Sequence, residues 1–178
     1  LRVVHSSGAS FNLGRVENSE IDESGLWLNV RTKEDGLQLY KVGATLERGE
    51  FPFKEASFAR SSPKGRWIVA YMPGNELHLA DTQSNLPPRV FKRQTQPGDP
   101  EGAEPLDTIN FSPLENWFVY IAPDHTGMLV DLTGGRDPVK FQDLADYAYP
   151  AFFEDETWVA FNNRKNVPTL YDLREGGA

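Results

Sequence analysis

Four tryptophans divide this sequence into stretches of similar length. They are Trp27, Trp67, Trp117 and Trp158, and they are separated by 40, 50 and 41 residues. A period of this size indicates a repeated supersecondary unit, so every stretch must be compatible with the same local structure. The longer interval contains a turn-rich insertion, QTQPGDPEGAEP, at residues 94–105.

Two further columns of residues follow the tryptophans. Twelve residues after each tryptophan stands a leucine: Leu39, Leu79, Leu129 and Leu170. Fourteen residues after it stand Lys41, Asp81, Asp131 and Asp172. A tryptophan at the start of a strand buries a large apolar surface, and its indole N–H can find a partner near the strand end. An aspartate can accept backbone hydrogen bonds from a following turn. We therefore expect these columns to be structural.

Each copy alternates short apolar segments with turns, which is typical of strands. The third copy reads TINF, the turn SPLEN, then WFVYI, a loop, GMLVDL and a last apolar stretch, DPVKFQ. The segments are rich in β-branched and aromatic residues, and the 15 glycines and 13 prolines of the chain favour tight turns over long helices. Four short antiparallel strands per copy are the plan of a β-propeller blade. The predicted fold is therefore all-β, with about four repeats of four-stranded antiparallel sheets, a number compatible with part of a larger propeller.

The columns also predict the domain boundaries. Residues 17–55, 56–93 and 106–142 are predicted blades, residues 94–105 the insertion, and residues 143–178 a blade lacking its last strand. Residues 1–16 contain LRVV and ASFNL, which fit either the last strands of a preceding blade or a strand that closes the C-terminal blade. Because the chain begins at leucine, we expect it to be a piece of a longer protein.

The third and fourth copies resemble the WD-repeat and TolB-like propeller families. The residues that carry this resemblance are Phe111, Ser112, Pro113, Trp117, Val130, Asp131 and Leu132, then Trp158, Leu170, Tyr171, Asp172 and Leu173. The resemblance covers roughly residues 17–175 and implies a turn between the first two strands of a blade and an aspartate that closes the third. No copy has the Gly-His dipeptide that WD repeats often carry, so the subfamily is not identified.

The sequence contains no catalytic constellation. The G-x-S-x-G motif of a hydrolase is absent, and so is a Gly-rich phosphate-binding loop. The chain has no cysteine, and its three histidines, His5, His78 and His125, lie far apart. We therefore expect no enzyme activity, no metal site and no cofactor in this chain, although a fused catalytic domain elsewhere stays open.

Charge is distributed unevenly along the chain. Residues 1–53 carry a net charge of −2, residues 54–93 carry +4 and residues 94–178 carry −10, for a total of −8. This balance argues against nucleic acid as a partner. The basic middle could bind an acidic partner or the acidic third of its own chain through Arg60, Lys64, Arg66, Arg89, Lys92 and Arg93. No stretch of about twenty apolar residues predicts a membrane span, and a chain without cysteine suits either the cytoplasm or a bacterial periplasm.

The best candidates for binding are the loops that join the second and third strands of each blade, since a rigid scaffold presents function on its loops. These loops are residues 31–36, 73–76, 123–127 and 162–168, and we expect the connections between blades to emerge on the same face. The candidate binding residues are Arg31, Lys33, Glu34, Asn75, Glu76, Asp124, His125, Asn162, Asn163, Arg164 and Lys165.

Three functions fit these observations. The leading hypothesis is a non-enzymatic propeller section that acts as a protein-interaction scaffold or sensing module within a larger, bacterial, multidomain protein. The alternatives are the substrate-gating propeller of a hydrolase or peptidase, and a TolB-like periplasmic interaction module. The expected partner is another protein or other domains of the same protein, and an open ring would favour self-association.

Overall fold

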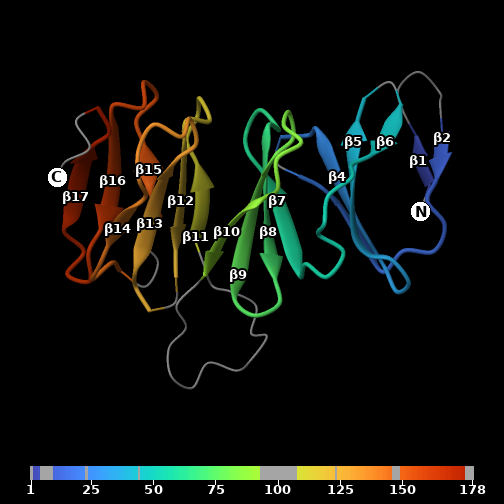
Figure 1. The fold of residues 1–178 in the computed structure, drawn as a ribbon, viewed down its shortest axis with the longest axis horizontal. Coiled ribbons are helices and arrows are strands. Elements are labelled where there is room, and N and C mark those ends of the chain that lie inside the picture. The colour runs from blue at the N-terminus through green and yellow to red at the C-terminus, as the bar shows by residue number, and fades with distance from the viewer. Residues whose placement is uncertain are drawn as a thin grey trace. The chain divides into compact units, whose positions relative to one another are not determined.

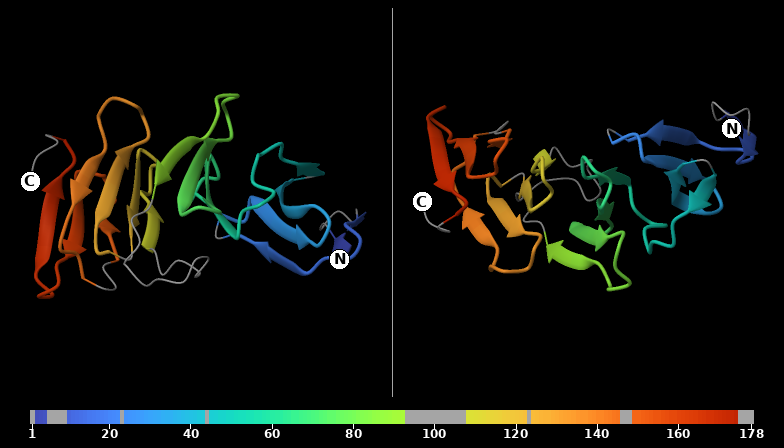
Figure 2. Two further views of the ribbon diagram at one scale, coloured as in Figure 1. Left: turned by 60° about the horizontal axis from the view of Figure 1, so that its bottom comes forward. Right: turned by 90° about the horizontal axis from the view of Figure 1, so that it is seen from above.

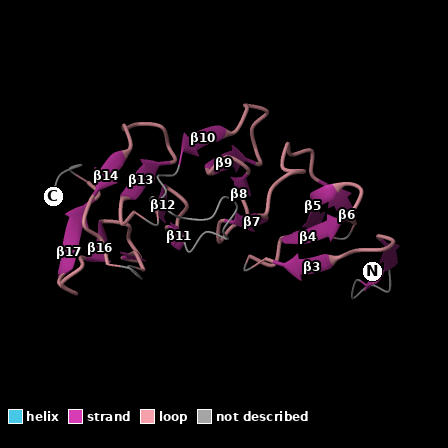
Figure 3. Cartoon of the chain, turned by 90° about the horizontal axis from the view of Figure 1, so that it is seen from below, coloured by secondary structure: helices cyan, strands magenta, loops and turns pink. Residues whose placement is uncertain are grey.

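The computed structural model describes residues 2–4, 10–22, 24–43, 45–92, 108–122, 124–145 and 149–174. This part of the chain consists of strands, turns and loops without a helix (Figure 3), which confirms the all-β prediction. Accordingly, no helix in these ranges has the length and hydropathy needed to cross a membrane. The predicted insertion at residues 94–105 and the histidine at position 5 lie outside the described residues. The chain divides into two compact units, Leu1–Lys92 and Arg93–Ala178, and each is described by itself.

The first unit contains a two-stranded sheet and two four-stranded sheets, all antiparallel (Figure 1). The two-stranded sheet pairs β1 (Arg2–Val4) with β2 (Ser10–Asn12). The next sheet is formed by β3 (Asn18–Ile21), β4 (Trp27–Thr32), β5 (Gly36–Val42) and β6 (Leu46–Arg48). The third is formed by β7 (Phe58–Ser61), β8 (Trp67–Met72), β9 (Glu76–Asp81) and β10 (Arg89–Lys92).

The second unit contains two further antiparallel sheets. The first has four strands, β11 (Thr108–Phe111), β12 (Trp117–Ile121), β13 (Gly127–Asp131) and β14 (Val139–Phe141). The second has three, β15 (Ala151–Phe152), β16 (Trp158–Asn162) and β17 (Pro168–Asp172). Strands that are consecutive in the chain are neighbours in every sheet. The four sheets from β3 to β17 are therefore propeller blades, and we number them one to four in chain order.

The strand registers show that the four copies fold alike. In every blade the tryptophan lies directly opposite the residue fourteen positions later: Trp27 opposite Lys41, Trp67 opposite Asp81, Trp117 opposite Asp131 and Trp158 opposite Asp172. The tryptophan therefore opens the second strand, and the +14 residue closes the third strand in blades two, three and four; in blade one that strand extends one residue further, to Val42. The interpretation of the repeat as a blade is confirmed strand by strand.

The core of each unit lies between neighbouring blades. In the first unit, Trp27 and Leu39 of blade one pack with Ile68 and Ala80 of blade two. Side chains alternate across a strand, so the tryptophan and leucine columns share one face of each blade. In blade two the opposite face, with Ile68 and Ala80, packs against blade one.

The same arrangement recurs in the second unit. Trp117, Val119 and Leu129 of blade three pack with Val159 and Phe161 of blade four. Face-to-face packing of twisted sheets buries both inner faces, and it explains why the repeat preserves these apolar positions.

The aspartate column stabilises the turn that follows the third strand, as expected. Asp81 Oδ1 accepts the backbone N–H of Gln83 at 3.0 Å. Asp131 does the same for Thr133 at 2.7 Å. Asp172 Oδ1 accepts the backbone N–H of Arg174 at 2.9 Å. These are Asx-turns, which a short carboxylate forms readily.

The first tryptophan links blade one to blade two by a hydrogen bond. The Nε1–H of Trp27 donates to the carbonyl of Gly65 at 3.0 Å, in the first turn of blade two. Gly65 has φ +73°, a left-handed conformation that glycine adopts without strain. Blade one thus contacts blade two through the carbonyl of this turn.

In blade two the aspartate of the column also pairs with a cation, which makes stability depend on pH. The pKa of Asp81 is lowered mainly by the side-chain hydrogen bond from Arg66, whose Nη2 lies 2.9 Å from Oδ2. A lowered pKa in the folded state adds stability above the pKa of the unfolded chain, about 3.9, and this stability is lost as the pH falls through the folded value.

Asp81→Asn is therefore expected to lower the free energy of unfolding at pH 7 by up to about 1 kcal/mol, because the Arg66 side chain is partly exposed and solvent screens the pair. The difference in the free energy of unfolding between the wild type and Asp81→Asn should shrink as the pH falls below about 4, where the wild-type carboxyl becomes neutral. Urea unfolding from pH 7 to pH 2.5 checks this prediction. A deficit that stays constant over the whole range would contradict it.

Candidate functional site

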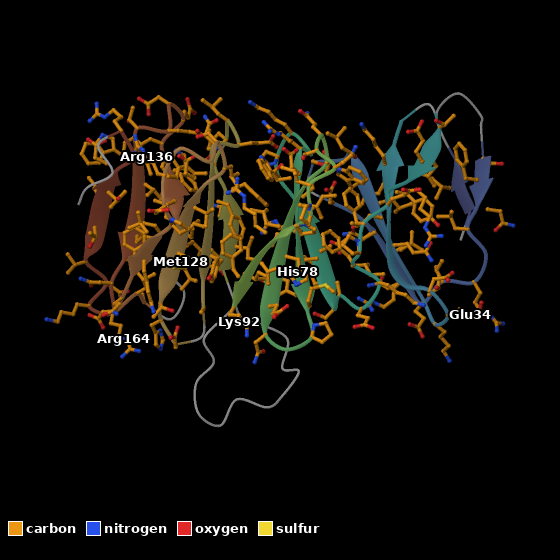
Figure 4. All side chains as sticks on the ribbon, viewed as in Figure 1. Glu34, His78, Lys92, Met128, Arg136 and Arg164 are labelled. Carbon is orange, nitrogen blue, oxygen red and sulfur yellow. The ribbon has the colours of Figure 1, made fainter. Side chains whose placement is uncertain are left out.

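The predicted binding loops connect the second and third strands of the blades. In Figure 4, Glu34 lies at the tip of the β4–β5 loop and Arg164 in the β16–β17 loop. Within the second unit, Arg164 and Arg136 lie at opposite ends of the strands (Figure 4), so these loops and the aspartate turns occupy different ends of a blade. Residue 123, the start of the third loop, lies outside the described residues.

The side chain of Arg31 has a structural role. Its Nη2 donates to the carbonyls of Ala56 at 2.6 Å and Ser57 at 2.8 Å, in the segment that leads into β7. Charge-assisted bonds of this kind are among the stronger ones in a protein. Of the predicted binding residues in blade one, Arg31 therefore fixes the next blade rather than presenting its charge to a partner.

Lys33 and Glu34 lie on the wall of a groove of about 710 Å³. The groove is bounded by residues 13–17, which connect β2 to β3, and by residues 32–35 of the β4–β5 loop. Arg15, Glu17 and Asp35 also line it, so its charges are mixed. The blade-connecting segment and the predicted loop do meet on one face here.

In blade two one predicted binding residue lies in the turn and the other, Glu76, is the first residue of β9 (Glu76–Asp81). Asn75 has φ +59°, a left-handed conformation that asparagine tolerates in tight turns. Glu76 Oε2 lies 3.0 Å from His78 Nε2 across one residue of β9. The half-buried His78 is therefore a strand residue that contacts a neighbouring carboxylate, as its position in ELHLAD predicts.

In blade three, Asp124 and His125 shape their own loop. Asp124 Oδ1 accepts the backbone N–H of Thr126 at 3.0 Å and its hydroxyl at 2.5 Å. His125 has φ +65°, and its carbonyl accepts the N–H of Leu144 at 3.1 Å. The loop is thereby attached to the segment that connects blade three to blade four.

Blade four attaches its loop to the same segment. Ala145 N–H donates to the carbonyl of Asn162 at 2.9 Å, and Arg164 N–H donates to the carbonyl of Asp143 at 3.1 Å. Asn163 Oδ1 accepts the N–H groups of Lys165 at 2.9 Å and Val167 at 3.0 Å. We call His125, residues 143–145 and residues 162–167 the second-unit loop cluster.

The second-unit loop cluster combines a fixed backbone with exposed side chains. Arg164 Nε lies 3.7 Å from Asp143 Oδ1, and both side chains are exposed, so this pair contributes little to stability. Lys165 and Val167 are also exposed. The cluster therefore presents two cations, one carboxylate and an apolar side chain on one surface. Such a surface can bind a partner, but no nucleophile and base are in contact within it.

Five of the predicted binding residues belong to the second-unit loop cluster, namely His125, Asn162, Asn163, Arg164 and Lys165, but the connecting segment at its centre was not predicted. Asp143 and Leu144 were not predicted, although the expectation that blade connections share the loop face pointed to them. Leu144 is buried, and a Cβ on Gly127 would lie 2.6 Å from its Cδ1. Gly127 therefore makes room for the connecting segment to reach the loops.

No metal centre accompanies this surface: in the described ranges, no three histidine, aspartate or glutamate side chains are grouped so that they could hold an ion. The sequence matches no protein-family model and no curated protein.

Proposed function

We propose that this chain is a non-enzymatic section of a WD-repeat-like or TolB-like β-propeller that binds a protein partner through the second-unit loop cluster. The observation that carries the proposal is the attachment of two blade loops to one connecting segment, through His125, Asp143, Ala145, Asn162 and Arg164. A surface whose backbone is already ordered loses little conformational entropy when a partner binds.

The chemistry of the cluster favours a partner with an acidic surface. Arg164 and Lys165 are adjacent and exposed, and Val167 adds apolar area beside them. Arginine with neighbouring apolar surface is typical of the centre of protein interfaces, whereas scattered surface charge is not. The alternative roles in substrate gating or in a periplasmic assembly would use the same surface.

Lys165→Glu is expected to weaken capture of the partner at least tenfold, because it replaces attraction by repulsion beside Arg164 in the cluster. Affinity capture from the source organism, quantified by mass spectrometry, checks this, with this protein as bait. The matched control is Lys140→Glu, which reverses an exposed lysine of β14 in the same unit.

A partner lost with Lys165→Glu and kept with Lys140→Glu supports the proposal. Equal capture by both variants would place the interface elsewhere. Turnover of a substrate by the isolated chain would contradict the non-enzymatic assignment.

A further inference from the structure

Phe153 departs from a hydrogen-bonding position that the other three blades share. In blades one to three, the residue five positions before the tryptophan accepts the backbone N–H of that tryptophan through a side-chain oxygen. The acceptors are Asp22 Oδ1 at 3.2 Å, Ser62 Oγ at 2.9 Å and Ser112 Oγ at 2.9 Å. Phe153 stands at this position in blade four, and a phenyl ring offers no oxygen to the N–H of Trp158. Blade four therefore lacks a stabilising hydrogen bond that its three copies have.

Phe153 gains no core packing in exchange. Its exposed fraction is 48%, whereas the adjacent Phe152 packs against the hydrophobic core of the second unit. A residue that breaks the local rule of its fold without an evident gain in packing is expected at a functional position. Phe153 is therefore better explained by binding than by folding.

A second exposed apolar side chain lies in the neighbouring turn. Leu114 is 49% exposed, and the equivalent positions of the other blades carry polar residues, namely Ser24, Lys64 and Asp155. Figure 2 shows the two turns concerned, between β11 and β12 in yellow and between β15 and β16 in orange-red. The N–H of Glu156 donates to the carbonyl of Phe153 at 2.9 Å, and its Oε1 accepts the N–H of Leu114 at 2.5 Å. Glu156 therefore fixes the turn of Phe153 against the turn of Leu114.

Two exposed carboxylates accompany these apolar side chains. Glu154 and Asp155 directly follow Phe153 in the same turn. The hydrogen bond from the Thr157 hydroxyl, at 2.8 Å, is the main cause that lowers the pKa of Asp155, so this carboxyl is charged at neutral pH. We call Leu114, Phe153, Glu154 and Asp155 the turn patch.

The turn patch carries negative charge that the adjacent cation does not cancel. Arg174 acts on Asp155 through space, but its Nη2 lies 2.6 Å from Asp172 Oδ2, so its charge is shared with a second carboxylate. Together with Glu154, these charges sum to −2. A partner that covers the patch is therefore favoured if it is basic.

The turn patch is separate from the second-unit loop cluster. The N–H of Leu173 donates to the carbonyl of Thr157 at 2.9 Å, and the carbonyl of Leu173 accepts Arg136 Nη1. The patch therefore lies at the strand end where Figure 4 labels Arg136, opposite the end that carries Arg164.

We propose that the turn patch binds a basic segment of a partner protein. An apolar side chain of that segment contacts Leu114 and Phe153, and its lysine or arginine residues pair with the two carboxylates. Within residues 1–178, the section with net positive charge is 54–93, and its strands are already paired in blade two, so it offers no extended basic segment. An aromatic anchor beside complementary charge is typical of the residues that contribute most to binding. This site does not rest on the proposed function, because it uses other residues and the opposite charge.

The test titrates the isotope-labelled chain with short peptides and follows its amide signals by heteronuclear NMR, which detects weak complexes. The peptide Lys-Leu-Lys-Phe-Lys is expected to produce saturable shifts at residues 113–115 and 153–155. Its charge-reversed form, Glu-Leu-Glu-Phe-Glu, and its apolar-depleted form, Lys-Ser-Lys-Ser-Lys, are each expected to bind at least about fivefold more weakly.

Phe153→Ser separates binding from folding. It is expected to weaken binding of Lys-Leu-Lys-Phe-Lys at least about tenfold, because it removes the aromatic anchor. It is also expected to raise the midpoint of urea unfolding, because a serine Oγ can accept the N–H of Trp158 as Ser62 and Ser112 do for their own tryptophans. A purely structural phenylalanine would give a lower midpoint instead.

Two leucine variants and one charge variant complete the series. Leu114→Ser is expected to weaken peptide binding, and Leu86→Ser is the matched control, because Leu86 is 77% exposed and lies in the first unit. Glu154→Lys is expected to weaken binding about threefold, as for one exposed ion pair.

Three outcomes would overturn the proposal. One is a peptide complex whose shifts lie at residues 162–167 and ignore Phe153. Another is equal binding of the basic and charge-reversed peptides, or no binding of either. The third is self-association that Phe153→Ser abolishes in the absence of peptide binding, since the occupant would then be a second copy of the chain.

Discussion

Trp117→Ala is expected to lower the free energy of unfolding of the second unit by about 3–5 kcal/mol, the usual cost of truncating a large aromatic side chain in a core. Trp117 is only 9% exposed and packs with Val159 and Phe161 of the next blade. Its removal would leave a cavity between two sheets, and the surrounding structure relaxes only partly around such a cavity. Far-UV circular dichroism during urea unfolding checks the prediction.

The repeat supplies a matched control for that variant. Trp158 occupies the same position in blade four but is only half-buried, so Trp158→Ala is expected to cost about 1–2 kcal/mol. Both rings carry an arginine over one face, Arg136 at 5.7 Å and Arg174 at 5.4 Å, so the comparison isolates burial. Equal losses for the two variants would contradict the assignment of the buried blade face.

Glu156→Ala is expected to cost about 2–3 kcal/mol, because it leaves hydrogen-bond donors without their charged acceptor. Glu156 lies in the first turn of blade four and is buried. Its Oε1 accepts the backbone N–H of Leu114 at 2.5 Å, and its Oε2 accepts Asn116 Nδ2 at 2.8 Å. The carboxylate thus binds the equivalent turn of blade three, where an unpaired N–H would otherwise remain.

Two further variants separate this contact from backbone strain. Glu156 has φ +53°, so Glu156→Gly relieves strain of about 1 kcal/mol and should be less destabilising than the alanine variant. Glu154→Ala changes an exposed carboxylate of the same turn and should alter stability by at most about 0.5 kcal/mol. Thermal unfolding of the three variants checks the order. A glycine variant as unstable as alanine, or an alanine variant no worse than Glu154→Ala, would rule out the proposed contact.

The blade itself could be predicted because its determinants are local and repeated. Trp27, Trp67 and Trp117 open strands and are buried, and the aspartates at 81, 131 and 172 form the expected turns. Hydrophobic alternation and turn residues act within a few positions along the chain. Because the same pattern occurs four times, a copy in which one position departs from it can still be aligned with the others.

The loop residues were predictable as a set but not in their individual roles. Arg31 and Arg164 are both arginines of predicted binding loops, but Arg31 lies within β4, one residue before its end, and only Arg164 lies in a loop. Arg31 is held by two carbonyls of the next blade, whereas Arg164 stays exposed beside Asp143. Which carbonyls lie within reach of a guanidinium depends on how neighbouring sheets pack, and a single sequence does not encode that distance in any local pattern.

Sequence periodicity alone was enough to establish the strands, their order and the residues of each blade face, because side-chain alternation follows directly from the pleat of a strand. Burial was decided by the tertiary structure. Leu170 has the same place in the repeat as Leu129, yet one is exposed and the other fully buried. Glycine and glutamate likewise share one turn position, as Gly65 and Glu156, but contact the adjacent blade in different ways. A residue's environment depends on what packs against its face, and in this chain that neighbour lies about forty residues away in sequence.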